Sequence, residues 1–195
     1  MIGSGLIKQI TTEYTRERNG VTSLDLKGLI REIPDFPQPG ISFKDISTVI
    51  GNAEAFHYII DEIAKHYRAS RPEVVVGIES RGYILGAPLA YELKAGFILV
   101  RKPGKLPSAI EKIDYSLEYG VNSLEIHADA IRPGQKVLIV DDILATGGTV
   151  SATAELVRRL GGEIIGYAFL AELDALNGRG KLGDAPIVSL VHYDD

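Results

Sequence analysis

The sequence predicts an α/β fold with a mainly parallel sheet flanked by helices. Short apolar runs are typical of buried strands, and helical stretches separate them. Strands that alternate with helices favour a parallel sheet covered on both faces. A length of 195 residues fits one domain with a sizeable core. The expected strands are 74–78, 97–100, 137–140 and 163–170, and the expected helices among them are 83–93 and 150–160.

The N-terminal part is expected to hold an extension and two helices. Residues 1–22 are polar and irregular, which indicates a loosely attached extension before a single domain over residues 23–195. Ser23 is the expected N-cap of a short helix that runs to about Arg31. Asn52 is the expected cap of a longer helix over 53–68.

The segment from Pro103 to about Ser123 shows little regular pattern. Long irregular connections in compact domains are usually functional or disordered, so we interpret this segment as a mobile lid. An exposed hairpin is the alternative interpretation.

The composition excludes several classes of function. The chain has no cysteine, which excludes disulfides and thiol nucleophiles, and its four histidines show no metal-ligand spacing. A net charge of −5 without a basic run argues against nucleic-acid binding. No apolar stretch reaches the length of a membrane span, and the N-terminal residues lack the basic start, apolar core and small-residue cleavage site that are typical of a signal peptide. We therefore expect a cytoplasmic protein that binds neither nucleic acid nor membranes.

The most informative segment follows the expected strand 137–140. Asp141 and Asp142 stand at its carboxyl end, and a loop of small residues then opens a helix. Such a loop brings backbone N–H groups and hydroxyls to a phosphate. The two carboxylates would be repelled by that phosphate, and they suit the hydroxyls of a ribose or a bound cation. The loop consists of Ala145, Thr146, Gly147, Gly148 and Thr149.

Known phosphate loops do not explain this segment. No lysine follows Gly148, as a P-loop requires, and the spacing of a Rossmann glycine loop is absent. An ordinary strand, turn and helix with an acidic turn stays open as an alternative.

Two further strand ends carry positive charge. The turn Glu79-Ser80-Arg81-Gly82 follows strand 74–78, and Arg81 with the turn's N–H groups suits a second anion such as pyrophosphate. Arg101, Lys102 and Lys105 follow strand 97–100 and also suit anion capture. A surface arginine and a solvated basic loop are the alternatives for these two segments.

A rigid segment with three prolines, between Pro34 and Pro39, leads to Phe43. Its aromatic ring suits stacking on a flat base, whereas plain core packing is the alternative.

These motifs together resemble the type I phosphoribosyltransferases, and the adenine-specific members in particular, from about Ile33 to the C-terminus. The resemblance implies the fold of that family, with a small hood formed near residues 33–50 and 171–195 and a flexible lid. It implies transfer of the phosphoribosyl group from phosphoribosyl pyrophosphate to adenine, which gives AMP and pyrophosphate. It also implies a homodimer and Mg²⁺ bound mainly through the substrate, with Asp141 and Asp142 as candidate protein ligands.

The resemblance assigns roles to individual residues. Glu118 handles the proton of the purine, Tyr119 packs on the closed site, and Arg81 is the third catalytic candidate. The adenine lies between Phe43 and Leu173, and the backbone around Ser42 and Lys44 reads its edge. The residues implied to bind phosphoribosyl pyrophosphate are Ser80, Arg81, Arg101, Lys102, Lys105, Asp141, Asp142 and the loop residues Ala145 to Thr149.

The resemblance also implies a cis peptide bond between Glu79 and Ser80. A phosphoribosyltransferase for hypoxanthine, guanine or xanthine is the nearest alternative, and a regulator that senses phosphoribosyl pyrophosphate is another.

Overall fold

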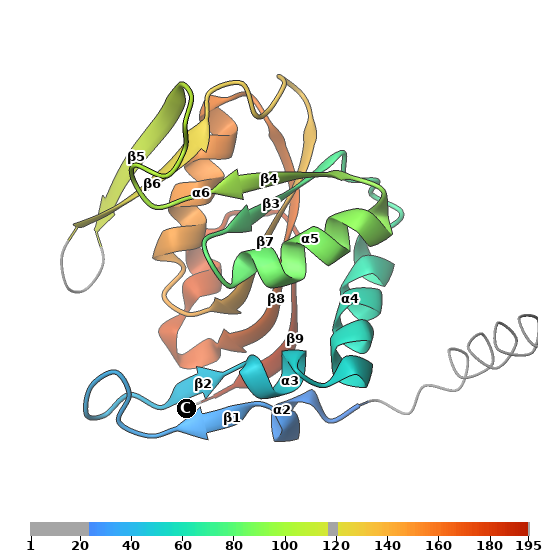
Figure 1. Cartoon of the computed structure of the whole chain (residues 1–195), viewed down its shortest axis with the longest axis vertical. Coiled ribbons are helices and arrows are strands. Elements are labelled where there is room, and N and C mark those ends of the chain that lie inside the picture. Colours follow the sequence, from blue (N-terminus) through green and yellow to red (C-terminus); the bar gives the residue numbers. More distant parts are fainter. Residues whose placement is uncertain (1–23, 117–120, 195) are drawn as a thin grey trace, which may run out of the picture.

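A computed structural model describes residues 24–116 and 121–194 of the chain. Its centre is a five-stranded sheet in the order β4-β3-β7-β8-β9, in which every neighbouring pair is parallel (Figure 1). This arrangement confirms the predicted fold class. The strands are β3 Val74–Ile78, β4 Gly96–Val100, β7 Lys136–Leu144, β8 Glu163–Leu173 and β9 Ile187–Tyr193.

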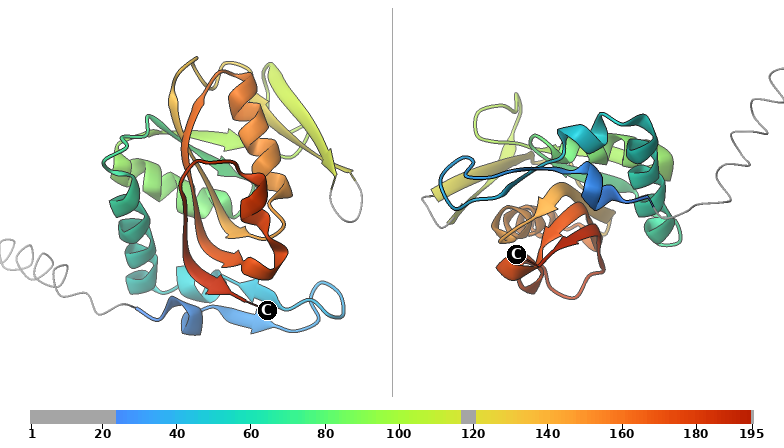
Figure 2. Two further views of the ribbon diagram at one scale, coloured as in Figure 1. Left: turned by 180° about the vertical axis from the view of Figure 1, so that it is seen from behind. Right: turned by 90° about the horizontal axis from the view of Figure 1, so that it is seen from below.

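Helices cover both faces of the sheet. The helices α4 Ala53–Tyr67 and α5 Gly82–Leu93 share one core with the sheet, and α6 Gly148–Arg159 packs into a second core on the other face (Figures 1 and 2). The expected cap of α4 is confirmed, because the side chain of Asn52 accepts a hydrogen bond from the N–H of Ala55.

The register brings two strand ends together. Gly77 of β3 pairs with Val140 of β7, so the turn that follows β3 lies beside Asp141. Strand β7 is longer than expected and includes both aspartates, because its pairing with β8 continues to Leu144. The prediction that the carboxylates follow the strand was therefore wrong by four residues.

The chain before α4 forms a small layer, here called the hood, beside the carboxyl ends of β7, β8 and β9 (Figure 1). It consists of α2 Leu26–Leu29, β1 Arg31–Ile33, β2 Phe43–Asp45 and α3 Ser47–Ile50, and β1 and β2 pair antiparallel. The Nζ of Lys27 donates to the carbonyl of His192, 2.8 Å away, and so ties this layer to β9.

The prediction for the first helix was wrong at both ends. Asp25 is the N-cap, since its carboxylate accepts from the N–H of Gly28. The helix ends before Arg31, which is drawn into β1 by its pairing with Asp45. Ser23 and the extension over residues 1–22 lie outside the described residues.

The expected irregular lid is an antiparallel hairpin of β5 Ile110–Ser116 and β6 Val121–His127. Period-two apolar positions explain it, because the buried side chains of Leu124 and Ile126 pack into the core that contains α6. The hairpin was the alternative interpretation of this segment. Residues 117–120 at its tip lie outside the described residues.

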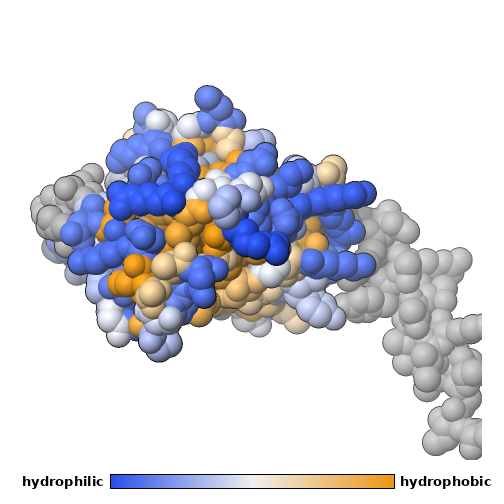
Figure 3. Space-filling view, turned by 90° about the horizontal axis from the view of Figure 1, so that it is seen from above, coloured by the Kyte–Doolittle hydropathy of each residue, from blue (hydrophilic) through white to orange (hydrophobic). Residues whose placement is uncertain are grey.

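Two short 3₁₀ helices, η1 Asp174–Leu176 and η2 Gly178–Lys181, connect β8 to β9. Seen from the end opposite the hood, hydrophilic residues cover much of the surface, with hydrophobic residues between them (Figure 3). Within the described residues, no helix has the length and apolar character needed to cross a membrane.

Candidate active site

A cavity of about 250 Å³ opens where β3 and β7 end. It brings together three of the predicted segments, which are the turn after β3, the two aspartates of β7 and the loop before α6. Its lining residues are Glu79, Ser80, Arg81, Asp141, Asp142, Ile143, Ala145, Thr146, Gly147, Gly148, Thr149 and Val150.

The loop at residues 145–149 is held in a conformation that suits an anion. Gly147 has φ = 74° and is the N-cap of α6, so the positive end of that helix faces the cavity. A Cβ atom on Gly147 would lie 2.5 Å from the carbonyl oxygen of Gly178, which explains why this position requires glycine. The hydroxyl of Thr149 lies 3.2 Å from that of Tyr115, a contact that connects the loop to the β5–β6 hairpin.

The two aspartates form an acidic pair at the cavity. The Oδ2 of Asp142 lies 2.8 Å from the Nε of Arg81, yet this buried oxygen has no hydrogen-bond partner among the described residues. Burial and the neighbouring Asp142 raise the pKa of Asp141 well above its ordinary value. Burial also raises the pKa of Asp142, although the guanidinium of Arg81 opposes that shift. The pair therefore favours partners that donate hydrogen bonds or carry positive charge.

The predicted cations after β4 gather around Glu79 rather than in this cavity. Lys105 forms an ion pair with Glu79, the Nε of Arg101 lies 3.4 Å from its carboxylate, and the N–H of Lys102 donates to it at 2.9 Å. Lys102 also lines a neighbouring cavity of about 460 Å³ that shares Glu79 and Thr149 with the first one. The peptide bond between Glu79 and Ser80 is cis, as the resemblance implied.

Ion pairing decides the charge state of Glu79. Burial would raise the pKa of its carboxyl group, but the hydrogen bonds from Lys105 and the N–H of Lys102 outweigh burial and lower it. Glu79 is therefore ionised at neutral pH.

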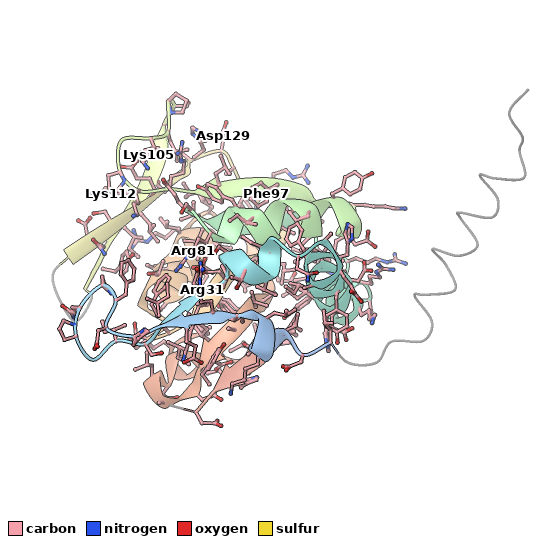
Figure 4. The ribbon with its side chains drawn as sticks, turned by 60° about the horizontal axis from the view of Figure 1, so that its bottom comes forward. Arg31, Arg81, Phe97, Lys105, Lys112 and Asp129 are labelled. Carbon is pink, nitrogen blue, oxygen red and sulfur yellow. The ribbon has the colours of Figure 1, made fainter. Side chains whose placement is uncertain are left out.

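Phe43 lies next to Arg81, whose guanidinium carbon is 5.3 Å from the centroid of the phenyl ring. Figure 4 shows Arg81 between the hood and the sheet, with Lys105 farther away beyond the end of β4. Phe43 is half-buried and also packs edge-on against Phe36. An aromatic surface therefore adjoins the cavity.

Ser42, Lys44 and Leu173, the other residues predicted to contact the base, have different surroundings. The Nζ of Lys44 is 2.9 Å from the carboxylate of Glu32, and the hydroxyl of Ser42 donates to the same carboxylate at 3.2 Å. Both side chains are thus engaged within the hood. Leu173 ends β8 and packs, half-buried, against the core on the α4 and α5 side.

Sequence reasoning missed some members of this site. It assigned no role to Glu79, although an acid beside Arg81 at a strand end was a usable signal. It gave no signal for the contact of Tyr115 with Thr149 or for the close approach of Gly178 to the loop, because both depend on distant segments meeting. Glu118 and Tyr119 lie outside the described residues.

Comparisons with known proteins agree on one family. The family model described as a phosphoribosyl transferase domain matches residues 48–188. The chain is 56% identical over 172 residues to an adenine phosphoribosyltransferase of Synechocystis sp., which covers 87% of this chain and 100% of that protein. It is 58% identical over 169 residues to that of Geobacter metallireducens, with 87% and 99% covered.

Solved structures give the same result. The adenine phosphoribosyltransferase of Thermoanaerobacter pseudethanolicus superposes with a TM-score of 0.84 at 51% identity, over 87% of this chain and 98% of that one. The enzyme of Saccharomyces cerevisiae, solved with an imino-altritol bisphosphate and adenine, gives a TM-score of 0.81 at 42% identity, with 85% and 96% covered. The chain therefore belongs to the phosphoribosyltransferase family, among its adenine phosphoribosyltransferases.

Proposed function

We propose that the protein transfers the 5-phosphoribosyl group from phosphoribosyl pyrophosphate to adenine and releases AMP and pyrophosphate. One observation carries the proposal: a single cavity joins the loop at 145–149, the Asp141–Asp142 pair and Arg81, and Phe43 adjoins it. The close relatives with the adenine phosphoribosyltransferase name support the same reaction.

The cavity suggests how the sugar phosphate is held. The 5′-phosphate binds the N–H groups and hydroxyls of residues 145–149 at the start of α6. The ribose hydroxyls donate to Asp141 and Asp142, and the Oδ2 of Asp142, which pairs with Arg81 but accepts no hydrogen bond among the described residues, supplies an acceptor. Holding both ends of the sugar orients its anomeric carbon toward the base.

The leaving group is held by positive charge. Breaking the anomeric C–O bond leaves a ribosyl cation and pyrophosphate, and prearranged donors stabilise the charge that develops. Arg81 and the N–H groups after Ser80 face the cavity, and Arg101, Lys102 and Lys105 complete the set from the segment after β4.

Magnesium fits this site as a companion of the substrate. Arg81 already pairs with the Oδ2 of Asp142, which leaves room for few direct protein ligands, while the acidic pair favours a nearby cation. Asp141 and Asp142 would hold Mg²⁺ together with the substrate, and the ion would neutralise charge on the pyrophosphate.

The base site rests on Phe43 and Leu173. Adenine stacks on Phe43, beside Arg81, with Leu173 on its opposite face. Because Glu32 engages the side chains of Ser42 and Lys44, these two residues contribute backbone groups to the base edge. Glu118 handles the purine proton and Tyr119 closes the site.

The proposal also covers the oligomeric state of the protein. Exposed apolar side chains on α5 and on the edge strand β4, namely Ile84, Tyr91 and Leu99, support a homodimer. Cytoplasmic location and the absence of nucleic-acid and membrane partners stay predictions.

Substrate screening tests the reaction. The protein is incubated with phosphoribosyl pyrophosphate, Mg²⁺ and one purine at a time, and nucleotide formation is measured. We expect AMP from adenine and little product from hypoxanthine, guanine or xanthine. Equal turnover of hypoxanthine would contradict the adenine assignment, and substrate binding without any product would favour a sensor.

The role of Glu118 is tested by Glu118→Leu. Loss of a positioned acid or base typically costs about 10²- to 10⁴-fold in rate, so we expect kcat to fall by at least about 10²-fold. Glu111→Leu in β5 of the same hairpin is the matched control and should keep its activity. An unchanged rate for Glu118→Leu would remove this residue from the mechanism.

A further inference from the structure

The carboxylate of Glu79 occupies the centre of the basic cluster. Its side chain is 9% exposed, and it pairs with Lys105, lies 3.4 Å from the Nε of Arg101 and accepts from the N–H of Lys102. All three partners belong to residues assigned above to pyrophosphate, although Lys102 is engaged through its backbone N–H alone. Without substrate, an internal anion therefore pairs with two of the cations that the leaving group needs, Arg101 and Lys105.

We propose that Glu79 is a positioning residue that holds Arg101, Lys102 and Lys105 in place and exchanges these partners with pyrophosphate as it binds and leaves. The proposal rests on the proposed function, because pyrophosphate is the product that this reaction releases.

The contacts explain how pyrophosphate can enter and leave while the basic cluster keeps an anionic partner in each state. The Nε of Arg101 is buried and only ion-paired with Glu79 at 3.4 Å, without a hydrogen bond among the described residues, so this donor gains a hydrogen bond when an incoming oxygen replaces Glu79. Pyrophosphate carries more negative charge and more acceptor oxygens than one carboxylate, and it can displace Glu79. When pyrophosphate departs, Glu79 recovers its ion pairs and the cations are not left unpaired in a partly buried place.

Glu79 also holds two segments in register. It follows β3, whereas its partners follow β4, and the parallel pairing of β3 with β4 places them side by side. The same basic segment is held a second time by Glu125 of β6, whose carboxylate accepts from the N–H of Gly104 at 2.9 Å. Glu125 forms a hydrogen bond to this segment without an ion pair to the three cations among the described contacts, which makes it a matched control.

The exchange predicts a particular kinetic pattern for Glu79→Gln. Removing the competing charge should tighten binding of both phosphoribosyl pyrophosphate and pyrophosphate, and it should slow the release of product. We expect KM for phosphoribosyl pyrophosphate and kcat to fall together. A purely structural role would instead raise KM, because the cations would no longer be held in place.

The experiment measures inorganic pyrophosphate binding by calorimetry, in the presence of Mg²⁺, together with AMP formation. We expect the Kd of Glu79→Gln to fall about tenfold, which corresponds to about 1.4 kcal/mol, and that of Glu125→Gln to change by less than about twofold. A folded Glu79→Gln variant with equal or weaker pyrophosphate binding would overturn the proposal. An equal gain in affinity for Glu125→Gln would also overturn it, since the effect would then reflect the loss of any negative charge near the basic segment and not the loss of the contacts of Glu79.

Two further measurements complete the test. If Glu79→Gln does not unfold cooperatively, Glu79→Asp replaces it, because the shorter side chain reaches Lys105 poorly. We expect this variant to bind pyrophosphate more tightly than the wild-type protein does. Equal or weaker binding overturns the proposal. AMP formation by the unchanged protein tests the reaction separately. Its absence would refute the proposed function, while unaltered pyrophosphate affinity in an active enzyme would refute only the role of Glu79.

Discussion

Asp141 and Asp142 combine a cost in stability with a use in binding. Burial and mutual repulsion raise the pKa of Asp141, so ionising it in the folded protein is harder than in the unfolded chain. The folded state therefore loses stability as the pH rises from the ordinary carboxyl range through the raised pKa. The sequence predicted both residues as ligands, but it could not show that Arg81 pairs with Asp142 from another strand end.

Replacing Asp141 with asparagine should separate stability from function. We expect Asp141→Asn to raise Tm at neutral pH by roughly 2–4 °C for each kcal/mol gained. The gain should shrink as the pH falls toward the ordinary carboxyl pKa, where the native aspartate is also neutral. AMP formation should drop by at least about tenfold, since one acceptor for the ribose is lost. Calorimetric melting over a pH series checks this, and a variant less stable than the unchanged protein at neutral pH would contradict it.

The loop at 145–149 and α6 act as one element, because the backbone of the loop packs against η2. A Cβ on Gly147 would meet the carbonyl oxygen of Gly178 at 2.5 Å. That contact fixes the N–H groups at the start of α6, on which phosphate binding is proposed to depend.

The substitution Gly147→Ala measures this close approach, and Gly134→Ala is its matched control. Both glycines have positive φ, 74° and 76°, but a Cβ on Gly134 would meet nothing within 4 Å. The control should cost about 1–2 kcal/mol for the left-handed backbone alone. We expect Gly147→Ala to cost at least about 1 kcal/mol more and to raise KM for phosphoribosyl pyrophosphate. Denaturant unfolding compares the two, and equal losses would show that the contact with Gly178 is unimportant.

At the scale of elements, the long regular segments were predictable and the short ones were not. The helix capped by Asn52 and the strand Val74–Ile78 have strong local patterns, and both predictions were confirmed. The hairpin of β5 and β6 was interpreted as irregular because its apolar alternation is interrupted by charged residues. Strand β7 was cut short at the aspartates, since its extension depends on pairing with β8 and not on local preference.

At the scale of the whole molecule, the sheet order explains the position of the site. The chain passes from β3 outward to β4 and returns to the other side of β3 as β7, so the direction of winding changes there. Ligands of open parallel sheets bind outside the strand ends at such a point. Sequence patterns placed polar residues near the carboxyl ends of the right strands, whereas the order of strands and the place of the hood (Figure 1) required the folded structure.

The proposed homodimer makes a prediction about the outer side of α5 and β4. Tyr91 is 86% exposed, Ile84 lies two helical turns before it, and the edge strand β4 presents the exposed Leu99. Burying such residues against a second copy would remove apolar surface from water. We expect Tyr91→Glu to shift the protein from dimer to monomer in sedimentation velocity and to reduce AMP formation. Leu176→Glu places the same charge on another exposed apolar residue and should leave the dimer intact. A wild-type protein that is monomeric would exclude the homodimer. A Tyr91→Glu variant that stays dimeric would place the interface elsewhere.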